Sequence, residues 1–307
     1  MQVGIVRELS VFSFGRLMAA WNCTPTVYSQ SMPQVVVEPV IRWAGSKRKL
    51  LPQLARYWRP EFKRYVEPFA GSACLFFRLH PECAVLGDIN QELMLTYRQM
   101  KANVGAVITE LAGLRKGKRI YLRLRRTDPN SLPPAARAAR FLYLNRFCFN
   151  GLYRTNEAGQ FNVPYSGRRC GNLPEPVELR AVARRLRRVT LVASDFEDVL
   201  RRVGPGDFVY MDPPFRVNGR RMFTQYDSTA FKHTDLFRLR RWMEALAKQR
   251  IPFLVSYAGS EEAQFLSDGF NTENLKVRRN IAGFTERRVL FDEVLISNIT
   301  PGEDVSC

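Results

Sequence analysis

Residue types that bind metal ions are scarce in this sequence. Its 307 residues include only six cysteines and two histidines, and no two cysteines form a CxxC pair. A structural zinc site needs about four clustered Cys or His ligands, and no such cluster is visible. The sequence therefore predicts no metal site. We expect the cysteines to be reduced and the protein to be cytoplasmic.

A long hydrophobic run is also missing. No apolar stretch approaches the roughly 20 residues that a membrane-spanning helix needs, so no membrane partner is expected. The most apolar stretch near the start, 9–21, is interrupted by Arg16 and preceded by Glu8, which disfavours a secretory signal. We assign 1–34 as an N-terminal arm of unknown role, expect it to be dispensable for chemistry, and note Met32 as a candidate start.

Acidic residues are the minority among the charged ones. The chain has 29 Asp and Glu against 47 Lys and Arg, a formal net charge of +18. Such an excess favours a polyanionic partner, because each Lys or Arg at a phosphate releases condensed counterions. A second explanation stays open at this point: most of the basic residues are Arg, which a GC-rich genome alone would favour.

Strand-like and helix-like segments alternate along most of the chain. We expect strands at 65–69, 84–86, 189–193, 208–211, 251–256 and 294–297, with helices at 49–57, 73–79 and 91–103. This alternation predicts an α/β fold with a doubly wound parallel sheet. The segment 105–188 interrupts it with Arg-rich, largely helical sequence. We therefore predict one α/β domain built from 35–104 and 189–300, an inserted subdomain at 105–188, and a tail at 301–307.

The most specific motif is Asp212-Pro213-Pro214-Phe215, directly after the strand expected at 208–211. Ligands of open α/β folds bind at the carboxyl ends of the parallel strands, where this loop would lie. The Asp212 carboxylate and the Pro213 carbonyl could accept the two hydrogens of an amino group, and Phe215 could stack on a planar base. The alternative is an ordinary strand end followed by a Pro-Pro turn.

A second motif, Glu67-Pro68-Phe69-Ala70-Gly71-Ser72, follows the first expected strand. Gly71 would let a ligand approach the backbone closely, although the GxGxxG spacing of dinucleotide sites is missing. Asp88 stands 17 residues later at the end of the next strand, where an acidic side chain can reach the ribose hydroxyls of an adenosine-containing cofactor. Asp88 could equally be a helix N-cap.

Taken in chain order, Trp43-Ala44-Gly45-Ser46-Lys47, EPFAGS, Gly87-Asp88-Ile89-Asn90 and DPPF resemble the Dam-type family, or D12 class, of N6-adenine DNA methyltransferases. The resemblance runs from 42 to 298 and includes 145–154, 161–165, 276–281 and 292–296. It implies a Rossmann-like methyltransferase sheet with an inserted, mostly helical DNA-recognition subdomain. It also implies S-adenosylmethionine as cofactor, double-stranded DNA as partner, and methyl transfer to N6 of a flipped adenine.

The resemblance assigns roles to individual residues. The catalytic residues would be Asp212, Pro213, Pro214 and Phe215. The cofactor would contact Trp43, Ala44, Gly45, Lys47, Pro68, Phe69, Gly71, Asp88, Ile89, Asp195, Phe196 and Asp212. DNA contacts would come from Arg42, Arg146, Asn150, Leu152, Arg154 and Pro164, with 156–159 as a hairpin turn that could enter a groove.

This chain departs from the family pattern at three positions. The family usually has Lys where Arg42 stands, Gly at Ser46 and Tyr at Phe215. Phe215 keeps the stacking face, so activity is expected to survive. Arg42 has a different reach from Lys, which puts a GATC target in question.

Several functional alternatives remain open from the sequence. The same acceptor geometry would serve N4-cytosine or RNA N6-adenine methylation, and a catalytically inactive DNA-binding homologue is a further alternative. A nicotinamide-dependent oxidoreductase is disfavoured by the missing glycines. The sequence does not reveal the recognition site or a role in restriction–modification, a mobile element or housekeeping. A monomer, located at the nucleoid, is the default expectation.

Overall fold

The structure, a computed structural model, describes residues 37–167, 171–214, 231–280 and 288–302. The predicted arm at 1–34 lies outside the described residues, as does all of the predicted tail except Pro301 and Gly302. Residues 35–307 form one compact unit, and the description below concerns this unit.

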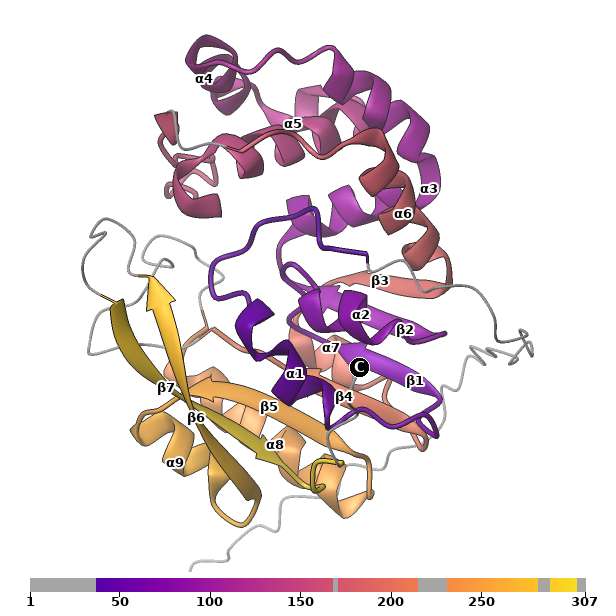
Figure 1. Cartoon of the computed structure of the whole chain (residues 1–307), viewed down its shortest axis with the longest axis vertical. Helices are drawn as coiled ribbons and strands as arrows, with labels where there is room; N and C mark the ends of the chain where they lie inside the picture. The colour runs from indigo at the N-terminus through magenta and orange to yellow at the C-terminus, as the bar shows by residue number, and fades with distance from the viewer. Residues whose placement is uncertain (1–36, 168–170, 215–230, 281–287, 303–307) are drawn as a thin grey trace, which may run out of the picture. The chain divides into compact units, whose positions relative to one another are not determined.

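The described part of the chain contains a seven-stranded sheet in the order β3-β2-β1-β4-β5-β7-β6 (Figure 1). Neighbouring strands are parallel from β3 to β5, whereas β7 runs antiparallel to both β5 and β6. The predicted α/β fold with a Rossmann-like sheet is confirmed, but the expectation of a wholly parallel sheet is wrong, because β7 is antiparallel to both of its neighbours. The strands are β1 (Arg64–Glu67), β2 (Ala84–Asp88), β3 (Val189–Ala193), β4 (Asp207–Met211), β5 (Phe253–Ala258), β6 (Asn271–Asn280) and β7 (Arg288–Ser297).

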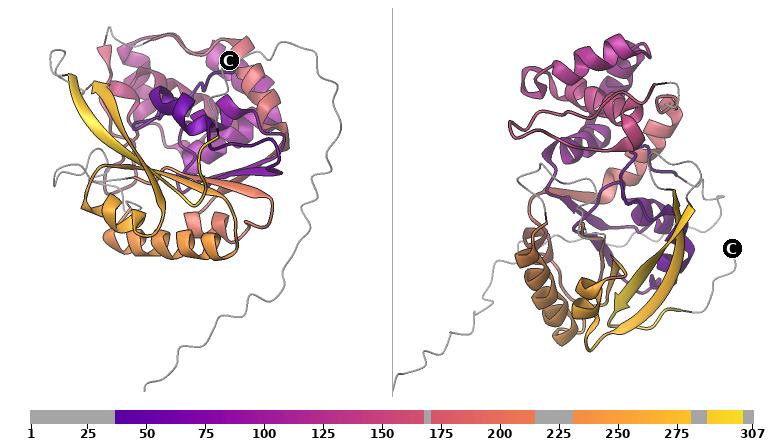
Figure 2. Two further views of the ribbon diagram at one scale, coloured as in Figure 1. Left: turned by 60° about the horizontal axis from the view of Figure 1, so that its bottom comes forward. Right: turned by 90° about the vertical axis from the view of Figure 1, so that its left-hand side faces the viewer.

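Alternating side chains bury both faces of the sheet. Tyr65 of β1 pairs in register with Phe208 of β4, and the next residues, Val66 and Val209, also pair. Because successive strand residues point to opposite faces, the first pair joins one hydrophobic core and the second pair joins another. Helices cover both cores, which makes the sheet doubly wound (Figure 2).

The first core is covered by α1 (Leu51–Ala55), which follows the 3-10 helix η1 (Arg48–Leu50), and by α2 (Cys74–Leu79) and α3 (Gln91–Ala112). The second is covered by α7 (Phe196–Leu200), α8 (His233–Lys248) and α9 (Glu261–Ser267). The strand predicted at 189–193 has the bounds of β3, whereas β6 was not predicted and β7 begins before the predicted 294–297.

The chain between β2 and β3 is helical apart from one irregular stretch. Its helices are α3, α4 (Lys118–Arg126), η2 (Pro129–Ser131), α5 (Pro134–Phe147), η3 (Phe149–Gly151), α6 (Pro176–Arg185) and η5 (Leu186–Arg188). The boundary predicted between 104 and 105 falls inside α3, just after a non-helical residue, Asn103. A small core of its own includes Tyr121, Tyr143 and Phe161. Its role as a DNA-recognition subdomain stays a prediction.

Cys74 and Cys148 are buried free thiols, and burial raises the pKa of the Cys74 thiol to about 11 and that of Cys148 to about 12. Cys83, in contrast, forms a disulfide bond, so the expectation that all the cysteines are reduced is wrong. Among the described residues no helix is long and apolar enough to cross a membrane.

Candidate active site at the carboxyl edge of the sheet

Asp212, the first residue after β4, stands at the carboxyl edge of the sheet and forms an ion pair with Lys47. The Lys47 ammonium lies 2.5 Å from Oδ1 of Asp212 and 3.0 Å from Oε1 of Glu293 in β7. The Lys47 side chain is 2% exposed and that of Glu293 0%, whereas 21% of Asp212 is accessible. Since a buried charge needs a partner, the two carboxylates hold Lys47 in place and Lys47 orients Asp212.

The two oxygens of the Asp212 carboxylate have different surroundings. Oδ1 accepts from Lys47 and also from the Ser256 hydroxyl, at 3.2 Å. Ser256 lies in β5, and the buried Tyr210 hydroxyl is 3.0 Å from its Oγ. No donor among the described residues bonds to Oδ2. The carboxylate is therefore fixed through one oxygen, while the other can accept a hydrogen bond from a ligand.

Glu293, Ser256 and Tyr210 were not predicted as site residues. Glu293 belongs to a segment that carried part of the family resemblance, but no role was assigned to it. Its place beside Lys47 depends on the antiparallel pairing of β7 with β5, in which Glu293 is opposite Ala258. That pairing has no local signal in the sequence.

Gly71 and Asp88 are joined directly, at the ends of β1 and β2. The Gly71 amide donates to Oδ2 of Asp88 and the Asn90 amide to Oδ1, both at 2.9 Å. Burial raises the pKa of Asp88 to about 6, although these two amides act to lower it. The neighbouring Ile89 is 42% exposed, a large apolar side chain left open beside the carboxylate.

Gly71 could not be replaced without disturbing this edge. It adopts φ +47°, and a Cβ there would lie 2.6 Å from Cδ1 of Trp43. Its carbonyl also accepts from the buried Tyr97 hydroxyl at 2.9 Å. The missing side chain therefore lets the Trp43 ring lie against the turn that follows β1.

Glu67 is the other buried carboxyl group near this edge. The Tyr65 hydroxyl donates to its Oε2 at 3.0 Å. Burial raises the pKa of Glu67 well above its ordinary value, and the nearby carboxylates of Asp212 and Asp88 raise it further. The hydrogen bond from Tyr65 acts in the opposite direction and lowers the pKa of Glu67.

An aromatic and charged cluster lies beyond Asp88. Phe69 stacks on Phe196 with ring centroids 5.2 Å apart. The Arg238 guanidinium of α8 lies 4.7 Å from the Phe196 ring centroid and 2.6 Å from Oδ1 of Asp195. Arg238 also pairs with Glu197 at 3.0 Å. Arg238, which was not predicted as a site residue, therefore contacts both of the predicted residues Asp195 and Phe196.

The remaining predicted residues of this edge lie around the same turns. Ala44 and Gly45 form an exposed turn closed by the Ser46 amide on the Trp43 carbonyl, with Gly45 at φ +84°. Pro68 and Pro213 are buried and Pro214 is exposed, whereas Phe215 lies outside the described residues.

Arg42, one of the residues predicted to contact DNA, connects this edge of the sheet to α5. The buried Asn145 side chain of α5 accepts from the Arg42 amide at 2.8 Å and donates to the Arg42 carbonyl at 2.6 Å. Trp43 stacks on Tyr153 with ring centroids 6.0 Å apart. Lys47 follows on the same short segment. The predicted cofactor residues and the predicted DNA residues are therefore neighbours in space.

The stretch 149–165 forms a loosely paired hairpin. Isolated bridges join Cys148 to Tyr165 and Thr155 to Phe161. The expected turn at 156–159 is confirmed, because the Asn156 amide donates to the Gln160 carbonyl at 2.9 Å. We call 149–165 the hairpin segment below.

Four of the predicted DNA contacts lie on the hairpin segment. Asn150 is exposed at φ +55°, Leu152 is half-buried, and Pro164 is exposed. Arg154 donates to Oδ1 of Asn162 at 2.7 Å.

Arg146 differs from the other predicted DNA contacts. It is half-buried against the segment that precedes Arg42, its guanidinium donates to the Val40 carbonyl at 3.4 Å, and burial lowers its pKa. Its position therefore fits a role in holding that segment.

The residues of this edge fit an adenosine-containing cofactor. The Gly71 turn holds the Trp43 ring at this edge, the Asp88 carboxylate suits ribose hydroxyls, and exposed Ile89 with Phe69 and Phe196 offers apolar surface for a base. No group of three or more potential metal-ligating side chains occurs in the described ranges.

Comparison with known proteins agrees with this geometry. The family described as D12 class N6 adenine-specific DNA methyltransferase matches residues 43–281. The Type II methyltransferase M1.LlaDCHI of Lactococcus lactis subsp. cremoris is 33% identical over 275 residues, which cover 86% of this chain and 96% of that protein. The DNA adenine methylase of Vibrio cholerae is 31% identical over 261 residues, covering 83% of this chain and 94% of its own. The chain therefore belongs to the D12 class of N6 adenine-specific DNA methyltransferases.

Proposed function

We propose that this protein transfers a methyl group from S-adenosylmethionine to N6 of an adenine that has left the stack of duplex DNA. The single observation that carries this is the asymmetry of the Asp212 carboxylate. Its Oδ1 is held by Lys47 and Ser256, and its Oδ2 bonds to no described residue at a partly exposed position. S-adenosylmethionine would supply the activated methyl group.

The acceptor groups follow from this asymmetry. Oδ2 of Asp212 would accept one hydrogen of the adenine amino group and the Pro213 carbonyl the other, which directs the nitrogen lone pair toward the methyl donor. Because Lys47 and Ser256 fix Oδ1 in advance, the acceptor needs no reorganisation when the base arrives. Most of the rate would then come from positioning and electrostatics. The base must be extruded, since its amino nitrogen cannot meet the donor within a stacked duplex.

The cofactor would be held by the groups around β1, β2 and α7. Asp88 would accept from ribose hydroxyls, and Phe69, Ile89 and Phe196 would enclose the adenine ring. Asp195, oriented by Arg238, would accept from the adenine amino group. These roles are proposals that rest on the family membership and on the contacts described above.

Asp212→Asn provides the test of this proposal. The protein is incubated with labelled S-adenosylmethionine and mixed-sequence duplex DNA, and the labelled nucleoside is identified by mass spectrometry. We expect N6-methyladenine from the wild type and a loss of at least about a hundredfold in rate for Asp212→Asn. Asp268→Asn, which changes an exposed carboxylate at the end of α9, should keep full activity.

Two results would overturn the assignment. Full activity of Asp212→Asn would remove Asp212 from the chemistry. N4-methylcytosine as product would keep the acceptor geometry but replace adenine as the substrate base.

A further inference from the structure

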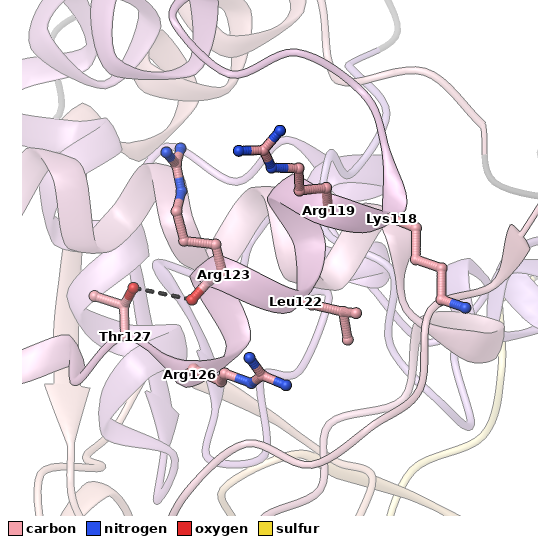
Figure 3. Close-up of a pocket in the computed structure, with 6 residues that line it drawn as sticks. All are labelled: Lys118, Arg119, Leu122, Arg123, Arg126 and Thr127. Atoms are coloured by element: carbon pink, nitrogen blue, oxygen red, sulfur yellow. Dashed lines mark hydrogen bonds between the residues drawn. The ribbon is translucent and has the colours of Figure 1, made fainter.

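One face of α4 is rich in exposed basic residues. The helix reads KRIYLRLRR, has no acidic residue, and exposes Lys118, Arg119, Arg123 and Arg126. Together with Leu122 and Thr127 these residues line an open hollow (Figure 3). Arg119, Arg123 and Arg126 have the i, i+4, i+7 spacing of a single helical stripe. We call these three residues the α4 stripe.

The cations of the α4 stripe have no partner in the part of the chain that the structure describes. Among the described residues none of their guanidinium groups forms an ion pair or a hydrogen bond. Like charges at i, i+3 and i, i+4 repel one another and weaken a helix. The stripe therefore does not contribute to the stability of α4, apart from its favourable position near the helix C-terminus. A function outside the folded chain would explain why three such cations stand together.

The other side of α4 is fastened to the hairpin segment. The buried Tyr121 hydroxyl donates to the Val163 carbonyl at 2.8 Å, and an Arg125 guanidinium nitrogen lies 3.4 Å from the same oxygen. The Arg140 guanidinium of α5 donates to the Leu124 carbonyl at 2.8 Å. The stripe is thus held at a fixed position relative to the residues predicted to reach the DNA bases.

We propose that the α4 stripe binds the phosphate backbone of duplex DNA beside the part that the hairpin segment reaches. This proposal rests on the proposed function, because it takes duplex DNA as the partner. Guanidinium groups bind phosphate with two parallel hydrogen bonds. From Arg119 to Arg126 the helix rises about 10 Å, roughly three base-pair steps of duplex. The contacts would carry no sequence information and would fix the register of the hairpin segment on the duplex.

A second arginine stripe in the same helical segment provides a matched control. Arg180, Arg184 and Arg187 of α6 and η5 are exposed at the same i, i+4, i+7 spacing. Figure 1 shows α4 and α6 at different ends of this helical segment. Two triple variants, Arg119→Gln/Arg123→Gln/Arg126→Gln and Arg180→Gln/Arg184→Gln/Arg187→Gln, therefore lower the net charge equally at two different places.

The measurement is the dissociation constant of the full chain for a mixed-sequence duplex over a range of salt concentrations. For the α4 triple variant we expect the slope of log K against log salt to fall by about two to three, since each lost phosphate contact removes about 0.9. The α6 triple variant should keep the wild-type slope. Affinity for S-adenosylhomocysteine should not change in either variant.

Two results would overturn the proposal: a wild-type slope in the α4 variant, or an equal loss of slope in both variants. The melting temperature of the α4 variant should equal that of the wild type, because the stripe forms no ion pair or guanidinium hydrogen bond among the described residues. The single variant Arg123→Lys keeps the positive charge and should therefore keep most of the wild-type slope of log K against log salt. Because binding is measured without turnover, failure of this proposal is distinct from failure of the methyl-transfer assignment, which is judged by the labelled nucleoside.

Discussion

Asp88 is the carboxylate whose protonation is expected to govern cofactor binding. Burial raises its pKa to about 6, so the carboxylate takes up a proton as the pH falls through that value. A protonated Asp88 can accept less from ribose hydroxyls. We therefore expect the dissociation constant for S-adenosylhomocysteine to be constant above about pH 7 and to rise about tenfold for each unit below about pH 6. Isothermal titration calorimetry would measure it.

Asp88→Asn is the control for this pH dependence. This variant should bind S-adenosylhomocysteine weakly, with a dissociation constant that does not change with pH. A wild-type profile that is equally flat would show that Asp88 does not titrate in this range.

The raised pKa of Asp88 also affects stability. Between the ordinary pKa of 3.8 and about 6 the folded protein binds more protons than the unfolded chain, so the contribution of Asp88 to the free energy of unfolding falls as the pH rises through that window.

Residue types at strand ends were predictable, but their partners were not. The sequence placed Asp212, Gly71 and Asp88 at one sheet edge because each follows a recognisable strand. Glu293 and Arg238 escaped prediction because their contacts cross long stretches of chain. Arg238, moreover, is one of several arginines on an amphipathic helix, and spacing gives it no distinction.

At the scale of elements, the buried Asn145 side chain of α5 holds the segment that carries Trp43 and Lys47. Asn145→Ala would leave the Arg42 amide and carbonyl without their partner, because both bond to this side chain. We expect the free energy of unfolding to fall by about 1–3 kcal/mol, as measured by denaturant titration. Affinity for both S-adenosylhomocysteine and duplex DNA should fall as well.

Asn298→Ala separates these two effects. The Asn298 side chain also bonds to a backbone amide and a backbone carbonyl, those of Phe253 and Ile251, but it does so away from Asp212 and Asp88. It should lower stability by a similar amount and leave both affinities unchanged. Equal losses of affinity in the two variants would contradict a specific role for Asn145.

Elements with strong hydrophobic patterns were predicted and those without were missed. The strand at 189–193 is apolar and bounded, and its prediction is confirmed. β6 has the sequence NTENLKVRRN, and most of its described side chains are exposed or half-buried. It is a strand because it pairs with β7 at the edge of the sheet, so its structure comes from the partner and not from its own composition.

At the scale of the whole molecule, the excess of 18 positive charges comes from basic residues spread along the chain. The sequence predicts a polyanionic partner from this excess but not where that partner binds, because the count is the same for a groove and for scattered solvated surfaces. The structure separates basic residues that are used internally, such as Arg238 with its carboxylates, from those that face outward, such as the α4 stripe.

The short segment 42–47 has a thermodynamic consequence. Arg42 is bonded to α5 at one end and Lys47 to the Asp212 carboxylate at the other, so any displacement of one end acts on the other. Binding of DNA and of the methyl donor should then be linked, and linkage is reciprocal. We expect duplex DNA to tighten binding of S-adenosylhomocysteine by about 5-fold or more, and S-adenosylhomocysteine to tighten DNA binding by the same factor. In Asn145→Ala both factors should approach one. The variant would still bind each ligand, but binding of one would no longer change the affinity for the other.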